Sequence, residues 1–217
     1  MPYSTLFFDL DDTLYPSTSG LWEAIRERMS RYMWERLNLP KEEVPDLRKH
    51  YFDTYGTTLR GLQIHHRVDA DEYLAYVHDL PLQSYIHPDP GLREMILGLS
   101  PRKWIFTNAD DQHAQRVLAE LDLVGCFNGI IDIRAIQFAC KPEIVAYQRA
   151  MALAGVVDPT RCVLLDDSPR NLAPAREMGF FTILVGTPDP DPSASLSLSS
   201  IIELPSAMPE LWNGRQK

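Results

Sequence analysis

Cysteine, long apolar runs and an N-terminal targeting pattern are scarce or missing in this sequence. The cysteines are Cys126, Cys140 and Cys162. Their odd number and wide spacing exclude a disulfide framework and favour buried free thiols in a reducing compartment. No apolar run approaches the ~20 residues that a membrane-spanning helix needs. Residues 1–4 lack a basic segment followed by an apolar stretch, so we expect a cytoplasmic protein without a secretory signal.

Positive charge is also in short supply. The chain has 21 Lys and Arg against 30 Asp and Glu, a formal charge of −9, which argues against a nucleic-acid polymer or an anionic membrane as the main partner. A phosphate substrate is not excluded, because local cations or a metal ion can offset the global sign. With 217 residues, 45% of them hydrophobic, the sequence fits a globular protein of one domain, or of one domain with a substantial insertion. It does not define the oligomeric state.

Short apolar runs alternate with helical patterns along most of the chain. A helix is expected over residues 111–121, and Pro142 is expected at the first position of the next helix, where its missing N–H costs least. This alternation predicts βαβ units, and therefore an α/β fold with a doubly wound, Rossmann-like parallel sheet. The expected strands cover residues 3–9, 103–107, 129–133, 162–165 and 180–185.

Residues 16–87 interrupt the alternation with a helical insertion. Apolar residues recur at helical spacing from Leu21 to Leu37, and further helices are expected near 41–54 and 70–77. The predicted α/β core therefore consists of residues 1–15 and 88–217. Residues 187–200 are rich in Pro, Ser and Asp and are expected to form a loop, and 205–212 a short helix that docks back on the core.

Two pairs of acids follow expected strands. Asp9 and Asp11 come after the first strand, and Asp166 and Asp167 after the fourth. Ligands of open α/β sheets bind beyond the carboxyl ends of the strands. The first pair alone could be a solvated acidic loop, but two acidic pairs at one edge would repel each other unless a cation lay between them. A hard divalent ion with oxygen ligands, most simply Mg²⁺, is therefore predicted.

Three further polar residues fall at comparable places. Thr107 and Asn108 end the second expected strand and could donate hydrogen bonds to phosphate oxygens, or could belong to a turn in which Asp110 or Asp111 caps the next helix. Lys141 lies in the loop before a helix, where it is either an ordinary surface lysine or a cation that neutralises phosphate.

Taken in order, these elements resemble the four-motif pattern of the haloacid dehalogenase-like superfamily, and its phosphatase branch in particular. The motifs are residues 9–14 (DLDDTL), Thr107-Asn108, Lys141-Pro142 and residues 166–168 (DDS). They extend from residue 9 to residue 168, so the resemblance covers most of the chain.

The resemblance implies a role for each motif residue. Asp9 would attack phosphorus and form an aspartyl-phosphate, and Asp11 would protonate the leaving oxygen and then activate water. Mg²⁺ would be held by Asp9, the backbone carbonyl of Asp11, Asp166 and Asp167. Thr107 and Lys141 would hold the phosphoryl group, with Asn108 beside them.

The resemblance also implies that residues 16–87 are a small helical cap that closes over the site and selects the substrate. A narrower likeness is to the pyrimidine 5′-nucleotidase-like subgroup, carried by residues 12–16 (DTLYP), 55–62 (YGTTLRGL), 77–81 (VHDLP) and 106–110 (FTNAD). Within it, Tyr15 and Arg60 are the expected substrate-binding residues, with Gly56 and Gly61 allowing a tight backbone path. Arg60 could equally be a solvated residue of a turn. His65 and His66 point apart on a helix and are expected to be surface or packing residues.

The expected activity is therefore that of a Mg²⁺-dependent phosphomonoesterase acting on nucleoside monophosphates. A phosphatase of sugar phosphates or other small metabolites stays open, because only the helical insertion would decide between them. A dehalogenase would also use an aspartate nucleophile, but would need neither Mg²⁺ nor the acid at Asp11. A non-catalytic binding or regulatory protein of the same fold is the alternative of another class, against which the complete motif set argues.

Overall fold

The computed structural model describes residues 2–212, which contain a parallel sheet of six strands. Its spatial order is β3-β2-β1-β4-β5-β6. The chain starts at the centre, winds outward to β3 and then returns to the other side of β1, so the direction of winding changes between β1 and β4. The predicted doubly wound α/β fold is confirmed, and the change of direction marks the expected ligand site. The strands are β1 (Thr5–Phe8), β2 (Arg102–Phe106), β3 (Gly129–Ile131), β4 (Cys162–Asp166), β5 (Phe181–Val185) and β6 (Leu196–Leu198).

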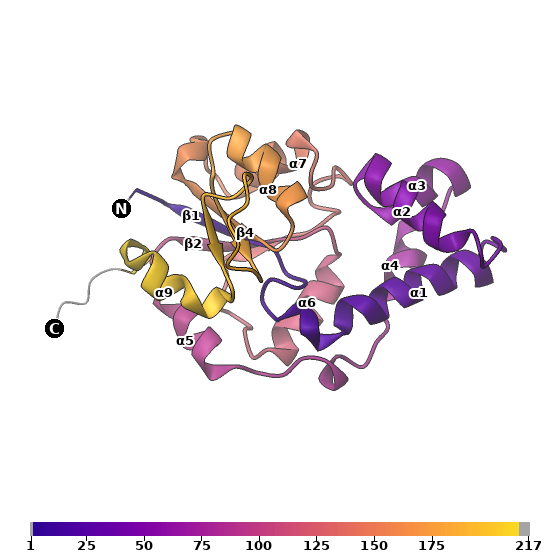
Figure 1. Ribbon diagram of the computed structural model, residues 1–217, viewed down its shortest axis with the longest axis horizontal. Coiled ribbons are helices and arrows are strands. Elements are labelled where there is room, and N and C mark those ends of the chain that lie inside the picture. Colours follow the sequence, from indigo (N-terminus) through magenta and orange to yellow (C-terminus); the bar gives the residue numbers. More distant parts are fainter. Residues whose placement is uncertain (1, 213–217) are drawn as a thin grey trace.

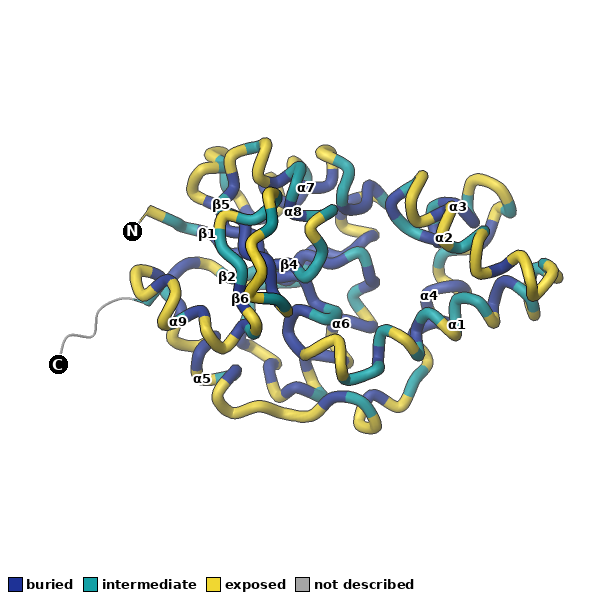
Figure 2. Tube along the Cα trace, viewed as in Figure 1, coloured by how far each residue is buried: buried dark blue, intermediate teal, exposed yellow. Residues whose placement is uncertain are grey.

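Helices cover both faces of the sheet because neighbouring side chains on a strand point to opposite sides. In β1, Leu6 and Phe8 join one apolar cluster, with residues of α5 (Pro90–Gly98) and α6 (Asp111–Glu120). Phe7 joins the other, with residues of α7 (Ile144–Leu153) and α8 (Pro169–Glu177). Figure 1 shows these helix pairs on either side of the strands, and Figure 2 shows the buried chain between them.

Four helices of the insertion gather at one end of the molecule, beyond the sheet (Figure 1). They are α1 (Leu21–Glu35), α2 (Val44–Tyr55), α3 (Thr58–His66) and α4 (Ala70–His78). The helical character predicted for the insertion is confirmed. The sequence patterns did not identify α3, which follows α2 after only Gly56 and Thr57.

The helix after Lys141 begins later than predicted. Pro142 does not open it: α7 starts at Ile144, with Glu143 at the N-cap position. The amide of Glu143 donates to the carbonyl of Cys140 at 2.8 Å. The chain therefore completes a turn around the lysine before the helix begins, and this turn leaves Lys141 buried instead of on a helix surface.

The tail corrects a second expectation. Residues 196–198 are not loop but the edge strand β6, paired with β5 in a register that sets Leu198 beside Val185. A three-residue strand among serines carries too little alternation to be recognised from sequence. Beyond it, Ile201, Leu204 and Leu211 pack into the cluster under α5, so the predicted docking of the tail on the core is confirmed. Here α9 (Leu204–Ala207) lies between short 3-10 turns at Ile201–Glu203 and Pro209–Leu211.

Among residues 2–212, none of the helices is long and apolar enough to cross a bilayer. All three cysteines are free and buried, as predicted.

Candidate active site

The carboxyl ends of β1 and β4 bring three carboxylates together. Phe8 pairs with Leu165, so Asp9 and Asp166 follow side by side, and the amide of Asp9 donates to the carbonyl of Leu165 at 2.8 Å. Asp9, Asp166 and Asp167 each offer an oxygen within 4.8 Å of the others. Asp166 is fully buried and Asp9 nearly so. Three of the four acids of the two predicted pairs therefore meet at this edge, whereas the carboxylate of Asp11 bonds other residues.

Lys141 is the cation of this cluster. Its Nζ donates to Oδ1 of Asp9 at 2.8 Å and to Oδ2 of Asp166 at 2.7 Å, and the residue is only 1% exposed. Burial works against the ammonium form, but the two carboxylates outweigh burial and raise the pKa of Lys141. A buried lysine that stays charged between two strand-end acids is no ordinary surface residue, and the surface alternative for Lys141 is excluded.

The cluster has more negative than positive charge. Burial raises the pKa of the Asp9 carboxyl, Lys141 opposes that effect, and Asp166 and Asp167 reinforce it. Burial, Asp166 and Asp12 raise the pKa of Asp167 to about 7. With all three carboxylates ionised, as cation binding requires, they and the Lys141 ammonium carry a net charge of −2, and all the ligand atoms are hard oxygens. This donor set fits a divalent cation of the Mg²⁺ type.

Asp11 lies in the turn that follows β1. Asp12 adopts a left-handed backbone conformation, with φ 58°, and the amide of Leu14 donates to the carbonyl of Leu10 at 3.0 Å. Oδ1 of Asp11 accepts one hydrogen bond from the Tyr15 hydroxyl at 2.6 Å and pairs with Nε2 of a histidine of α6, His113, at 2.9 Å.

These contacts set the charge of Asp11. Burial alone would raise the pKa of its carboxyl, but His113 and Tyr15 outweigh burial, and the pKa is lowered. Burial and the neighbouring Asp11 raise the pKa of Tyr15, so its hydroxyl remains a donor. Tyr15, which the sequence marks as a substrate-binding residue, here contacts the carboxylate of Asp11.

The residues at the end of β2 support the same edge. Thr107 is 1% exposed, and its Oγ1 accepts from the amide of Ala109 at 3.0 Å. Asn108 spans the gap to Lys141: its Nδ2 donates to the carbonyl of Lys141 at 3.0 Å, and its Oδ1 accepts from the amide of Lys141 at 2.8 Å. Asn108 thus fixes the backbone of the lysine loop. Asp110 occupies the N-cap position of α6, as the capping alternative has it, but its side chain makes no capping hydrogen bond and pairs with His78 instead.

The segment expected to face the substrate lies against the core loop before Lys141. Arg60, in α3, donates from Nη1 to the carbonyl of Phe138 at 3.0 Å. Gly56 has φ 87°, and a Cβ there would lie 2.6 Å from Sγ of Cys140. Gly61 is inside α3 and not in a turn, and a Cβ there would meet the Tyr51 ring at 2.3 Å. The two glycines serve close approach of neighbouring groups.

His65 and His66 pack within the insertion, as expected. Nε2 of His65 lies 2.7 Å from the Tyr55 hydroxyl, and Nε2 of His66 lies 2.9 Å from the Tyr51 hydroxyl.

Sequence reasoning missed two residues that contact the predicted site. Asn171, in α8, donates from Nδ2 to both oxygens of Asp166, at 3.0 and 3.2 Å. His113 reaches Asp11 from the buried face of α6. A signal for it was present, since His113 is four residues before Val117 on the apolar stripe, in a helix that begins at the carboxyl edge of the sheet.

Fold and site together define an α/β protein with an acidic centre, whose oxygens fit a cation, at the switch point of a parallel sheet. The family model for haloacid dehalogenase-like hydrolases matches residues 3–179, and the chain belongs to that family. The family membership predicted from the four motifs is confirmed.

One yeast protein is similar to most of this chain. Phosphate metabolism protein 8 of Saccharomyces cerevisiae is 30% identical over 187 residues, which cover 80% of this chain and 58% of the yeast protein. The chain thus spans less than two thirds of that relative.

Among solved structures, the HAD-hydrolase YfnB of Bacillus subtilis, bound to magnesium, superposes with a TM-score of 0.64 at 18% identity. The match covers 96% of this chain and 100% of YfnB. The β-phosphoglucomutase of Clostridium difficile gives 0.60 at 16% identity, over 96% of each chain. At these identities the likeness concerns the fold.

Proposed function

We propose that this protein is a Mg²⁺-dependent phosphomonoesterase that works through an aspartyl-phosphate on Asp9. The observation that carries the proposal is the buried ammonium of Lys141, bonded to both Asp9 and Asp166 at the edge where β1 and β4 end. A carboxylate held beside a cation, with an acid two residues away, suits phosphoryl transfer, which needs alignment and charge neutralisation. The name of the yeast relative, which refers to phosphate metabolism, is consistent with the proposal.

The proposed reaction has two steps. A carboxylate oxygen of Asp9 forms a bond to phosphorus while the ester P–O bond breaks, and Asp11, in its protonated form, gives that proton to the departing oxygen. In the second step Asp11 takes a proton from water, the hydroxide attacks phosphorus, and phosphate leaves Asp9. Lys141 favours the ionised form of Asp9 and orients its carboxylate, and Thr107 and Lys141 hold the phosphoryl oxygens. Asp9, Asp166, Asp167 and the carbonyl of Asp11 would hold Mg²⁺, which supplies charge neutralisation when bound.

For the substrate we propose a nucleoside monophosphate, after the likeness of several segments to the pyrimidine 5′-nucleotidase-like subgroup. Residues 16–87 would serve as the cap, with Tyr15 and Arg60 on the substrate side. Support comes from the position of Arg60, which reaches the carbonyl of Phe138, three residues before the catalytic lysine. Sugar phosphates are the competing substrates, since the same chemistry serves any small phosphate ester.

The test is phosphate release from UMP, CMP, AMP, GMP and common sugar phosphates, each with Mg²⁺ and with EDTA. Release that EDTA abolishes and that is fastest for UMP or CMP supports both parts of the proposal. Release that EDTA abolishes but that is fastest for a sugar phosphate supports the proposed mechanism and refutes the proposed nucleoside monophosphate substrate. Release that EDTA leaves unchanged contradicts the metal requirement.

Asp9→Asn is the matched variant, and Asp189→Asn, in the exposed tail, is its control. We expect Asp9→Asn to abolish turnover while the fold persists, and Asp189→Asn to retain it. Appreciable Mg²⁺-dependent turnover by Asp9→Asn would refute the covalent mechanism. If the wild-type protein releases no phosphate from any ester but is stabilised by them, a binding or regulatory protein of the same fold is the better description.

A further inference from the structure

The carboxylate of Asp11 is held by one of its two oxygens. The Tyr15 hydroxyl donates to Oδ1 at 2.6 Å, and Nε2 of His113 lies 2.9 Å from the same atom. Because an ionised carboxylate only accepts hydrogen bonds, Nε2 of His113 carries the hydrogen, and the other ring nitrogen, Nδ1, has no partner among residues 2–212. Two donors occupy Oδ1, so a proton that binds Asp11 goes to Oδ2.

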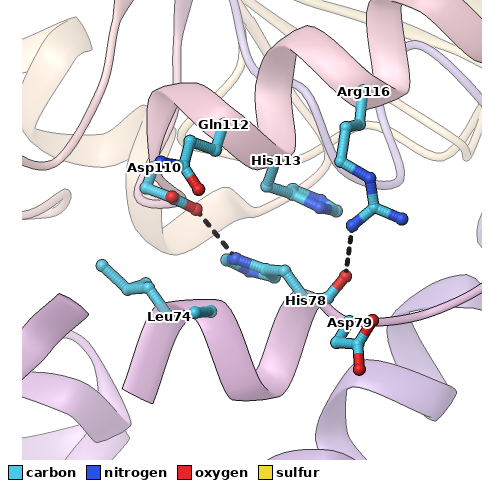
Figure 3. Close-up of a pocket in the computed structure, with 8 residues that line it drawn as sticks. Leu74, His78, Asp79, Asp110, Gln112, His113 and Arg116 are labelled. Atoms are coloured by element: carbon cyan, nitrogen blue, oxygen red, sulfur yellow. Dashed lines mark hydrogen bonds and ion pairs between the residues drawn. The ribbon is translucent and has the colours of Figure 1, made fainter. Parts of the chain in front are cut away.

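The ring of His113 is in turn held by the insertion. His78, the last residue of α4, stacks on it with ring centroids 4.1 Å apart and an angle of 17° between the planes. Nδ1 of His78 lies 2.9 Å from Oδ1 of Asp110 at the start of α6. Arg116 of α6 donates to the carbonyls of His78 at 2.7 Å and Leu80 at 2.6 Å, and so anchors the end of α4. Figure 3 shows His78, Asp110, His113 and Arg116 where the end of α4 meets α6.

We propose that His113 is a positioning residue for Asp11, and that His78 holds His113 in place from α4. This inference rests on the proposed phosphatase function. Together with Tyr15, His113 fixes Oδ1, so that Oδ2 delivers the proton to the departing oxygen as the P–O electron pair moves onto that oxygen. The carboxylate left behind keeps both donors. The insertion thus contributes to proton transfer through His78, which acts on His113 and not on the substrate.

The test depends on the leaving group. An alkoxide leaving group needs the proton of Asp11, whereas p-nitrophenolate leaves with little help. We therefore compare kcat/KM, which reports the steps up to phosphorylation of Asp9, for p-nitrophenyl phosphate and for the fastest alkyl ester of the panel above. General acid catalysis contributes roughly 10²–10⁴-fold. We expect His113→Leu to lose about 100-fold with the alkyl ester and less than about 10-fold with p-nitrophenyl phosphate.

Substitution of His113 by an amide side chain distinguishes a positioning role of this residue from a packing role. A glutamine amide can reach the place of Nε2, whereas an asparagine amide is too short. We expect His113→Gln to restore most of the alkyl-ester activity and His113→Asn to behave like His113→Leu. His78→Ala should show a smaller loss with the same dependence on the leaving group. His50→Gln, on the exposed surface of α2, is the histidine control and should retain wild-type rates.

Each outcome decides the matter. Equal losses for both esters would show that His113 serves packing alone, and unchanged rates in His113→Leu would show that it does not act on Asp11; either overturns the inference. If His113→Leu does not fold, the comparison of His113→Gln with His113→Asn gives the same decision. A wild-type enzyme that hydrolyses neither ester refutes the proposed function, and the inference with it. A wild-type enzyme whose His113 variants keep its leaving-group dependence refutes the inference alone.

Discussion

The surplus negative charge between β1 and β4 predicts that Mg²⁺ stabilises the wild-type protein. Asp9 and Asp166 both bond the buried ammonium of Lys141, and Asp167 lies beside them, so the ionised form of this cluster carries a net charge of −2 that a bound cation would offset. A cation that binds only the folded state adds RT ln(1 + [L]/Kd), which is about 2.7 kcal/mol at a hundred times Kd. For a chain of this size each kcal/mol raises Tm by roughly 2–4 °C. The expected shift is therefore about 5–11 °C.

Asp9→Asn changes this balance in two ways. The amide removes one anionic ligand, and a hundredfold weaker Kd would leave only about 0.4 kcal/mol at the same Mg²⁺ concentration. The amide also removes one of three repelling charges, while its oxygen still accepts from Lys141. Because burial raises the pKa of the Asp9 carboxyl, an ionised Asp9 destabilises the folded state when no metal is bound. We therefore expect Tm in EDTA to be equal to or higher than that of the wild type.

The assay is a thermal melt of both proteins over a Mg²⁺ titration, with NaCl holding ionic strength constant so that general screening is matched. The expected wild-type curve rises with log [Mg²⁺] once the site saturates, and the Asp9→Asn curve stays nearly flat. A wild-type protein that Mg²⁺ does not stabilise would refute the charge argument. An Asp9→Asn protein with the full shift would place the cation elsewhere.

Three further predictions concern stability and local opening. The pKa of Asp167 is raised to about 7 from 3.8, chiefly by burial and Asp166, so the folded state holds this proton more tightly than the unfolded chain. In EDTA, the contribution of this proton to the stability of the fold should therefore fall as pH rises from about 4 to about 7. A difference in Tm between the wild type and Asp167→Asn that stays constant over this range would contradict the prediction. Gly61→Ala places a Cβ 2.3 Å from the Tyr51 ring and should cost about 1–3 kcal/mol in urea unfolding, and an unchanged midpoint would disprove the close contact. Arg170 donates to two backbone carbonyls near the end of α2, at 2.9 and 3.0 Å, and Arg170→Gln removes these donors. The variant should exchange amide hydrogens faster in α2, while β4 keeps its protection. Equal protection of α2 in both proteins would show that Arg170 does not anchor this helix.

The strand-end motifs could be predicted because each is a short contiguous segment with its own physical signature. A buried apolar strand followed at once by Asp9, or by Asp166 and Asp167, fixes which edge of the sheet the acids occupy. The acids then meet because the strand order makes β1 and β4 neighbours. Lys141 could be identified from its order among the motifs. Its burial could not be predicted, because it depends on a turn before α7 that the sequence pattern assigns to the helix, with the helix start at Pro142.

The rest of the site depends on contacts that no local pattern encodes. His78 and His113 are 35 positions apart in sequence and meet only because α4 packs beside α6. Asn171 reaches Asp166 through the packing of α8 on β4. β6 could not be predicted for a different reason: its three residues carry no strand pattern of their own, and they form a strand because they pair with the edge of β5.

The insertion contacts the acidic edge of the sheet on two sides, an arrangement that under the proposed function would link substrate recognition to chemistry. On the side of Asp11, His78 stacks on the histidine that bonds Asp11. On the side of Asp9, Sγ of Cys140 donates to the carbonyl of Tyr55 at 3.3 Å, next to the lysine that bonds Asp9. A movement of α2–α4 away from the core would separate both contacts, and with them the supports of the proposed nucleophile and of the proposed acid. Because the insertion would bind the part of the substrate that does not react, a poorly bound substrate should lower kcat as well as raise KM.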